Sequence, residues 1–239
     1  MDAAYVAIHI EEDRSHWWFR GRLAVILAAL RRALPPRRVR LLELGCGSGN
    51  VLASLSEFGE AVGMDGHGDL VAAARAAGLD VRAGHLPDDL GVPQGWADVV
   101  LLLDVIEHVD DDLATLRAAH TSVGEGGLLV VTVPAYQWLW SGHDEVLGHR
   151  RRYAAAELRA AVERAGFTVL RVSYFNTLLF PLLLAARAAK RLRGDRGHDL
   201  RHPAAPINWL LERVFAFERH LVPRVRLPFG SSLLLIGRR

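Results

Sequence analysis

The chain has 239 residues, of which 51% are hydrophobic and 23% are charged, a composition that can bury a full core and excludes a largely disordered chain. The formal net charge is +2 and the pI is near 9.0. Acidic residues gather between positions 88 and 112, whereas arginines dominate after position 187. The basic C-terminal third is therefore expected to meet phosphates or an anionic membrane surface.

Two features of the sequence bear on the compartment. No apolar run approaches the roughly 20 residues needed to span a bilayer, and the N-terminus lacks the ordered regions of a signal peptide. The single cysteine, Cys46, has no partner for a disulfide, which favours a reducing compartment. We therefore expect a cytoplasmic protein, with peripheral membrane contact as an open alternative and with room for a homo-oligomer.

Residues 1–36 are predicted to form an N-terminal lid of one or two helices. From Trp18 to Leu34 the apolar residues recur at helical spacing, and two prolines end the segment. The aromatic run after His16 has two explanations of equal weight. It packs on the core as a cover, or it roofs a ligand pocket with an arginine reaching an anionic group.

Alternating strand and helix patterns follow the lid. The run from Trp96 to Leu103 is continuously apolar, which suits a strand buried on both faces. Repeated βα units of this length predict an α/β fold with a doubly wound, mostly parallel sheet of seven strands and a ligand at the carboxyl ends of the central strands. The predicted strands are 39–44, 60–65, 79–82, 96–103, 127–133, 167–172 and 231–239, with helices at 51–58, 70–77, 113–120 and 154–165.

The last third departs from this rhythm. An apolar helical stretch from Phe175 to Arg193, broken at Pro181, precedes a polar segment and a second helix from Ile207 to Leu221. An excursion of this length is too long for a plain connector. It predicts a helical cap, residues 175–229, inserted into a core formed by residues 37–174 and 230–239.

A glycine-rich segment after the first strand, LLELGCGSGN at 41–50, has the composition of a ligand-binding loop. Its glycines can take positive φ and admit a ligand close to the backbone, while Glu43 suits a cationic group. A nicotinamide loop wants G-x-G-x-x-G, but here the spacing is G-x-G-x-G and the sixth position is Asn50. Asp65, at the end of the next strand, can accept both hydroxyls of a ribose in either cofactor class.

On these residues the sequence resembles the class I S-adenosylmethionine-dependent methyltransferases. ELGCGSG at 43–49 looks like their first motif, VGMDGH at 62–67 like their second, and ADVVLLLDVIEHV at 97–109 like their fourth-strand motif. The resemblance implies a Rossmann-like methyltransferase fold and S-adenosylmethionine as the cofactor. By similarity, the cofactor-binding residues would be Arg22, Glu43, Gly45, Cys46, Gly47, Gly49, Asp65, Gly66, His85, Leu86 and Asp104.

A closer similarity is to a bacterial subgroup that is marked by two further segments. HWWFRGR at 16–22 and VPAYQWLWSGHDEVLGHRRRY at 133–153 are similar to the type 11 and type 12 methyltransferases. The second segment leaves the carboxyl end of the fifth strand, where acceptor contacts are expected. This resemblance implies the type of reaction more firmly than the acceptor.

The 134–153 loop holds the predicted catalytic residues. His143 is the candidate general base, because its unperturbed pKa lies near operating pH and adjacent carboxylates can orient it. His149 and Tyr153 are the other candidates. The alternative explanation is a salt-bridged lid in which arginines pair Asp144 and Glu145 and the histidines are structural.

Asp104, Glu107 and His108, in DVIEHVDDD, form a candidate divalent metal site, since positions three and four apart share a helical face. The ubiquinone-pathway O-methyltransferases and small-RNA 2′-O-methyltransferases look similar here. The favoured expectation is nevertheless that no metal binds and that Asp104 lines the cofactor. If a metal does bind, His143 or His149 would complete its ligands.

The cap places aliphatic residues ahead of a basic edge, within 175–193. This pattern fits a helix in a membrane interface or a cover over a lipidic acceptor, and burial against the domain or a partner subunit is the alternative. Nucleic acid is not expected, because the arginines are not interleaved with stacking aromatics.

Together these features predict methyl transfer from S-adenosylmethionine to an oxygen of a small-molecule or lipid-linked acceptor. The alternatives are C- or N-methylation of a secondary metabolite and a non-catalytic interaction module that binds S-adenosylmethionine. A nicotinamide-dependent oxidoreductase is disfavoured by Asn50.

Overall fold

The computed structural model describes residues 15–192 and 203–239. Parts of two predicted segments lie outside these ranges: the start of the N-terminal lid, up to Arg14, and the polar segment in the cap that contains residues 194–199. Among the described residues, no helix is both long and apolar enough to cross a membrane.

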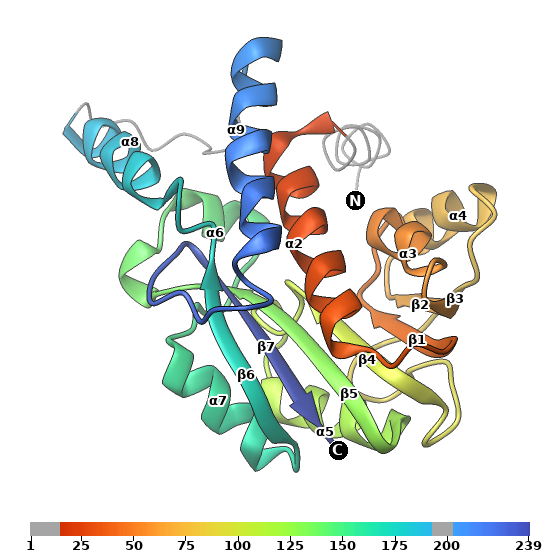
Figure 1. Cartoon of the computed structure of the whole chain (residues 1–239). Helices are drawn as coiled ribbons and strands as arrows, with labels where there is room; N and C mark the ends of the chain where they lie inside the picture. Colours follow the sequence, from red (N-terminus) through yellow and green to blue (C-terminus); the bar gives the residue numbers. More distant parts are fainter. Residues whose placement is uncertain (1–14, 193–202) are drawn as a thin grey trace.

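A single seven-stranded sheet organises the chain, as predicted (Figure 1). Its strand order is β3-β2-β1-β4-β5-β7-β6, and all neighbours are parallel except that β7 runs antiparallel to both β5 and β6. The fold class predicted from the sequence is thereby confirmed. The strands are β1 (Val39–Leu44), β2 (Gly59–Asp65), β3 (Val81–Ala83), β4 (Ala97–Leu103), β5 (Val123–Pro134), β6 (Thr168–Phe175) and β7 (Ser232–Arg238).

Helices cover both faces of the sheet because successive strand residues point to opposite sides. In β4, Val99 and Leu101 belong to one buried cluster, whereas Val100 and Leu102 belong to the other. The first cluster is closed by α2 (Trp17–Ala33), α3 (Asn50–Leu55), α4 (Gly68–Ala76) and α9 (Ala205–Phe217), and the second by α5 (Asp112–Ser122) and α7 (Ala155–Arg164).

The carboxyl ends of the parallel strands form one edge of the sheet, which we call the carboxyl edge. There β5 leads into a 3-10 turn, η1 (Gln137–Leu139), and then into α6 (Gly142–Leu147). Helix α8 (Phe180–Leu192) leaves the same edge after β6, and Figure 1 shows it projecting away from the sheet.

Helices α2 and α9 stand side by side, and α9 extends beyond the start of α2 (Figure 1). The amide of Trp17 donates to Asn208 Oδ1 at 2.9 Å, and Asn208 Nδ2 donates to the carbonyl of Ser15 at 2.9 Å. Phe215 is fully buried and stacks on Phe175, with ring centroids 6.1 Å apart. The predicted lid is therefore fixed to an element from the far end of the chain.

The boundary between β6 and α8 corrects the sequence prediction. Phe175 is not the start of a helix; it is the last residue of β6, and the chain turns at Asn176, which has a φ of 54°. The prediction that Pro181 breaks the helix is also wrong, because α8 begins at Phe180. A proline in the first turn removes only an amide that has no partner within the helix.

A buried carboxylate fixes the cap to this turn. Glu218, in the 3-10 turn η2 (Glu218–His220), is fully buried and accepts the amide of Leu178 at 2.8 Å. Burial raises the pKa of this carboxyl, against the hydrogen bonds from the backbone at 176–178 that lower it. The cap elements lie between β6 and β7 in the chain, and their assignment as a separate unit stays a prediction.

We expect Gly21→Ala to destabilise the contact between α2 and α9. A Cβ at Gly21 would lie 2.3 Å from Cδ1 of Phe215, so overpacking should lower the free energy of unfolding by about 1–3 kcal/mol. Urea unfolding measures it. Gly68→Ala is the matched control, since a Cβ there meets nothing within 4 Å, and equal stability of the two variants would contradict the packing described.

Candidate functional site

The glycine-rich loop between β1 and α3 takes backbone conformations that favour glycine. Gly45, Gly47 and Gly49 have φ values of 71°, 55° and 81°. A Cβ on Gly45 would lie 2.7 Å from Val105, whereas a Cβ on Gly47 would meet nothing within 4 Å. The loop is thus packed tightly at its base and open above Gly47, where a ligand can approach the backbone.

Asp65 links this loop to the end of β2. Its carboxylate accepts the amide of Gly47 at 2.8 Å and the amide of His67 at 2.8 Å. A Cβ on Gly66 would lie 3.3 Å from the carbonyl of Gly84 and 3.7 Å from the ring of His85. The predicted cofactor residues Gly66 and His85 are therefore neighbours in space, and Leu86 is partly buried.

Glu43, near the end of β1, and Cys46, within the loop, are both buried. Burial raises the pKa of the Cys46 thiol, and the nearby carboxylates of Glu43 and Asp65 raise it further. The thiol therefore stays protonated at neutral pH, which excludes a reactive thiolate and leaves Cys46 as a packing residue.

Arg22 reaches from the lid helix to the carboxyl edge of the sheet. Its Nε lies 2.6 Å from Asp104 Oδ2, and its Nη2 donates to Thr132 Oγ1 at 3.3 Å. Asp104 has a φ of 57° and donates its amide to the carbonyl of Thr132. One buried arginine thus joins α2 to the ends of β4 and β5, beside the glycine loop.

Glu107, His108 and His149 come together just beyond β4, with ligand atoms that all lie within 4.8 Å of one another. Glu107 is fully buried, and neither of its carboxylate oxygens has a hydrogen-bond partner among the residues that the structure describes. Burial raises the pKa of Glu107 well above its usual value, as does the charge of Asp104, while Arg22 and Arg152 oppose the shift. Orphaned oxygens beside two imidazoles fit a cation.

The protonation state of His108 also suits the binding of a cation. Burial and the neighbouring His149 lower the pKa of His108 to about 4, so the ring is neutral at physiological pH and can bind a cation. Asp104, predicted as the first metal ligand, is instead engaged by Arg22. The structure brings His149 into the cluster in its place.

Asp144 orients His149. Its carboxylate lies 2.8 Å from His149 Nδ1 and forms a buried two-pronged ion pair with Arg152, at 2.7 and 3.0 Å. Burial would raise the pKa of Asp144, but the hydrogen bonds from His149 and Arg152 outweigh it and lower the pKa. A carboxylate that fixes one ring nitrogen leaves the other directed at a ligand or proton.

The other two predicted catalytic residues differ in their surroundings. His143 is half-buried near the start of α6, where Ser141 and Asp144 form a capping box. Tyr153 is buried, its hydroxyl lies 2.7 Å from Asp112 Oδ2, and burial raises the pKa of Tyr153 above its usual value. This geometry favours a structural role for Tyr153, and its catalytic role stays a prediction.

An aromatic cluster lies where β5 and β6 end. Tyr136, with a φ of 59°, stacks on Tyr174 at 5.0 Å and lies 5.3 Å from Trp138, which is 64% exposed. Phe180 lies 6.0 Å from Tyr136 and 6.3 Å from Trp138 between ring centroids. The structure thus joins Tyr174, from β6, and Phe180, from α8, to the aromatic residues of the loop after β5.

Three residues of the site were not predicted from the sequence. Thr132, Tyr174 and Phe180 join it from strand and helix positions that read as ordinary core residues. The pairing of Arg152 with Asp144 was considered only as part of a structural lid. No local signal distinguishes these residues, since their roles depend on which strands become neighbours.

The comparisons agree with this fold. A model of the methyltransferase-domain family matches residues 17–172. A probable S-adenosylmethionine-dependent methyltransferase of Mycolicibacterium smegmatis is 33% identical over 161 residues, which cover 64% of this chain and 60% of that protein. A ubiquinone biosynthesis O-methyltransferase of Methylobacterium nodulans is 33% identical over 159 residues, covering 59% and 64%.

Among solved structures, an S-adenosylmethionine-dependent methyltransferase from Archaeoglobus fulgidus has a TM-score of 0.59 and 19% identity, with 100% of each chain covered, which supports the fold. The matched regions span less than two thirds of the length of the two curated relatives. The family model, which matches more than half of the chain, places the protein in the methyltransferase class. The chain belongs to the class I S-adenosylmethionine-dependent methyltransferases, which confirms the predicted family and its cofactor.

We expect Asp144→Asn to lower the free energy of unfolding at pH 7 by about 3–5 kcal/mol, because it leaves Arg152 buried without its counter-charge. The folded-state pKa of Asp144 is lowered, so this stabilisation is present above the unfolded value of about 3.9 and is lost as pH falls through the folded value. In the asparagine variant, the free energy of unfolding should not show this decrease at acidic pH. Urea unfolding at neutral and acidic pH measures both effects.

Glu145→Gln is the control for this prediction, because Glu145 is the adjacent acid and is exposed. It should stay within about 0.5 kcal/mol of the unsubstituted protein. A similarly small change in Asp144→Asn would show that the buried pair contributes little.

Proposed function

We propose that this protein transfers the methyl group of S-adenosylmethionine to an oxygen of a small-molecule or lipid-linked acceptor. The observation that carries the proposal is the open glycine loop tied to Asp65, with Glu43 buried near the end of β1. An edge rich in carboxylates suits a sulfonium cofactor, which is a cation. Family membership supports the donor, and the loop after β5 supports the acceptor side.

The cofactor contacts are those that the resemblance to class I methyltransferases implies. The loop amides would line the methionine part, the Asp65 carboxylate would accept ribose hydroxyls, and Glu43 would support the ammonium group. Residues 84–86 would flank the adenine. The pair of Arg22 and Asp104 would close the pocket from the lid side.

Methyl transfer itself needs the acceptor atom in line with the sulfonium methyl, so positioning does most of the work. A base is needed only where the acceptor must lose a proton near neutral pH. His143, on the loop after β5, is the proposed base for a hydroxyl acceptor. Binding of S-adenosylhomocysteine without any turnover would favour the alternative of a non-catalytic interaction module.

The aromatic cluster around Tyr136 and Trp138 favours an acceptor with an aromatic ring or an apolar chain. The name of the Methylobacterium nodulans relative, a ubiquinone biosynthesis O-methyltransferase, points to oxygen as the atom methylated by that protein. Both considerations support O-methylation of a ring hydroxyl here. An alkyl catechol is therefore a suitable probe acceptor for turnover assays.

Titration with S-adenosylhomocysteine tests the cofactor site. We expect saturable binding that Asp65→Ala weakens by about 2–3 kcal/mol, since hydrogen bonds to a charged group are lost. Asp80→Ala, the same substitution at an exposed position, should bind like the unsubstituted protein. Calorimetry that detects no binding at high micromolar concentration would overturn the proposal.

The cluster of Glu107, His108 and His149 would hold a divalent cation, which would supply Lewis acidity to an acceptor hydroxyl. Mn²⁺ titration followed by electron paramagnetic resonance measures its binding. We expect His149→Gln to weaken Mn²⁺ binding at least about tenfold. His220→Gln, at an exposed histidine in η2, should leave it unchanged, and equal affinity in both variants would argue against a metal at this cluster.

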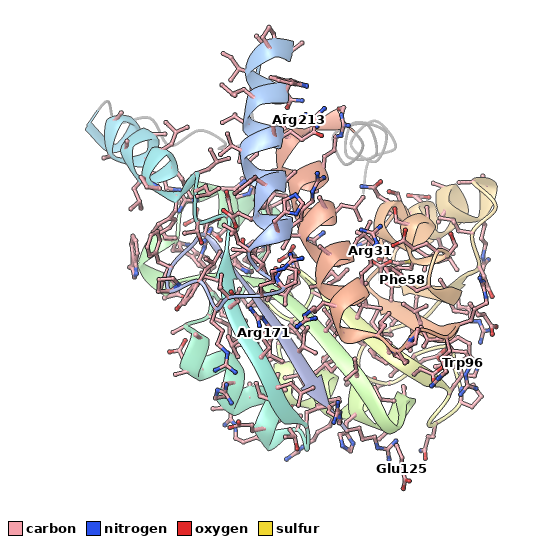
Figure 2. All side chains as sticks on the ribbon, in the orientation of Figure 1. Arg31, Phe58, Trp96, Glu125, Arg171 and Arg213 are labelled. Atoms are coloured by element: carbon pink, nitrogen blue, oxygen red, sulfur yellow. The ribbon has the colours of Figure 1, made fainter. Side chains whose placement is uncertain are left out.

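The cap would contact an anionic bilayer that holds a lipid-linked acceptor. Large apolar side chains are exposed on it, among them Leu182 at 57% and Trp209 at 57%, and Arg213 lies over the Trp209 ring (Figure 2). The fraction of protein that sediments with phosphatidylglycerol vesicles should fall severalfold in Trp209→Ser. The control is Val146→Ser, at an exposed site on α6. Phe58 is not a suitable control position, because it packs on the core.

A further inference from the structure

A cleft with a volume of ≈ 250 Å³ lies between the C-terminal end of α2 and the strands β6 and β7. Leu128 and Ile236 are among the apolar side chains that line it. Its charged lining consists of four arginines from four separate parts of the chain, and no acidic residue belongs to it. These are Arg32 on α2, Arg171 on β6, Arg224 after η2 and Arg238 at the end of β7.

The positive charge of this cleft is not neutralised within the part of the chain that the structure describes. None of the four arginines forms an ion pair with a described carboxylate. By contrast, Arg20, Arg31, Arg37 and Arg159 on the same protein each reach an acid. The four cleft arginines thus differ from these exposed arginines in lacking a counter-charge.

Arg171 is held in place by the backbone and retains donors for a ligand. Its Nη2 donates to the carbonyls of Val222 and Val225, whereas its Nε is buried and has no hydrogen-bond partner among the described residues. Burial lowers the pKa of Arg171, and the charges of Arg226 and Arg32 lower it further. Cations are therefore crowded around a fixed guanidinium, a repulsion that a bound anion would relieve.

The cleft lies at the opposite edge of the sheet from the cofactor loop. Leu170 stands near the start of β6, and Leu128 of β5 pairs with Arg238, the last residue of the antiparallel β7. Figure 2 shows Arg171 beside the lower part of α2 and Arg213 higher up, on α9. A ligand here would not compete with the cofactor, and the apolar tip of the cap faces elsewhere.

We propose that this cleft binds a phosphate-bearing ligand, with a diphosphate or a phosphate ester as the chemical class. Guanidinium groups bind phosphate oxygens through paired hydrogen bonds, and several convergent arginines favour a multiply charged anion over a single carboxylate. The apolar walls formed by Leu128 and Ile236 accommodate a carbon skeleton attached to that phosphate. The ligand is a free phosphate metabolite or the phosphate headgroup of a lipid, which share this chemistry.

Calorimetric titration of the full chain with inorganic pyrophosphate, in the presence of S-adenosylhomocysteine, tests the proposal. We expect saturable 1:1 binding that Arg32→Gln combined with Arg238→Gln weakens at least about tenfold, because both arginines are exposed and carry no structural hydrogen bond among the described residues. Arg117→Gln combined with Arg164→Gln removes the same charge from exposed positions on α5 and α7. This control should bind pyrophosphate like the unsubstituted protein.

A second arm distinguishes the two sources of phosphate. Phosphatidylcholine vesicles with and without phosphatidic acid are sedimented with the same two double variants. Loss of phosphatidic acid binding only in the cleft variant would identify a lipid headgroup, whereas pyrophosphate binding alone would identify a free metabolite. The proposal fails if neither probe binds, or if the cleft and control variants lose affinity equally, since the effect would then be one of net charge.

Discussion

The ion pair between Arg22 and Asp104, 2.6 Å long, is the contact on which the carboxyl edge depends. It fixes the lid helix to the end of β4, and the bond to Thr132 extends the attachment to β5. It also compensates Asp104, whose charge would otherwise add further to the raised pKa of the buried Glu107. One arginine on a helix that precedes the sheet in the chain thus joins the ends of β4 and β5 and opposes the raised pKa of Glu107.

The charge distribution gives the two edges of the sheet opposite preferences. Among the described residues, the buried acids at the carboxyl edge are Glu43, Asp65, Glu107, Asp144 and, beside the turn after β6, Glu218, and the buried arginines there are Arg22 and Arg152. Acids in excess favour cations, which fits a sulfonium cofactor and a divalent metal. At the opposite ends of these strands, four arginines line the cleft described above, and no acidic residue belongs to its lining. A net charge of +2 therefore conceals two strongly polarised regions.

The features that the sequence predicted are those with a local cause. Glycine spacing, a strand-terminal acid and continuous apolar runs specify the loop, Asp65 and the buried strands through backbone geometry and burial alone. The start of α8 was missed because an apolar run does not distinguish the end of a buried strand from the first turn of a helix. The pairing of Asp144 with His149 was missed for a different reason. It depends on how the loop folds back after α6, and that is fixed by Arg152.

The position of β7 inside the sheet has a consequence for folding. Among the strands of the described chain, the edge strand β6 pairs with β7 alone, although the whole cap separates the two strands in the chain. Contacts between residues so distant in sequence form late, because the loop-closure entropy precedes any gain from pairing. During synthesis β6 therefore remains without a neighbour until β7 has left the ribosome. Its unpaired backbone is then a site where a chaperone or a second nascent chain can add a strand.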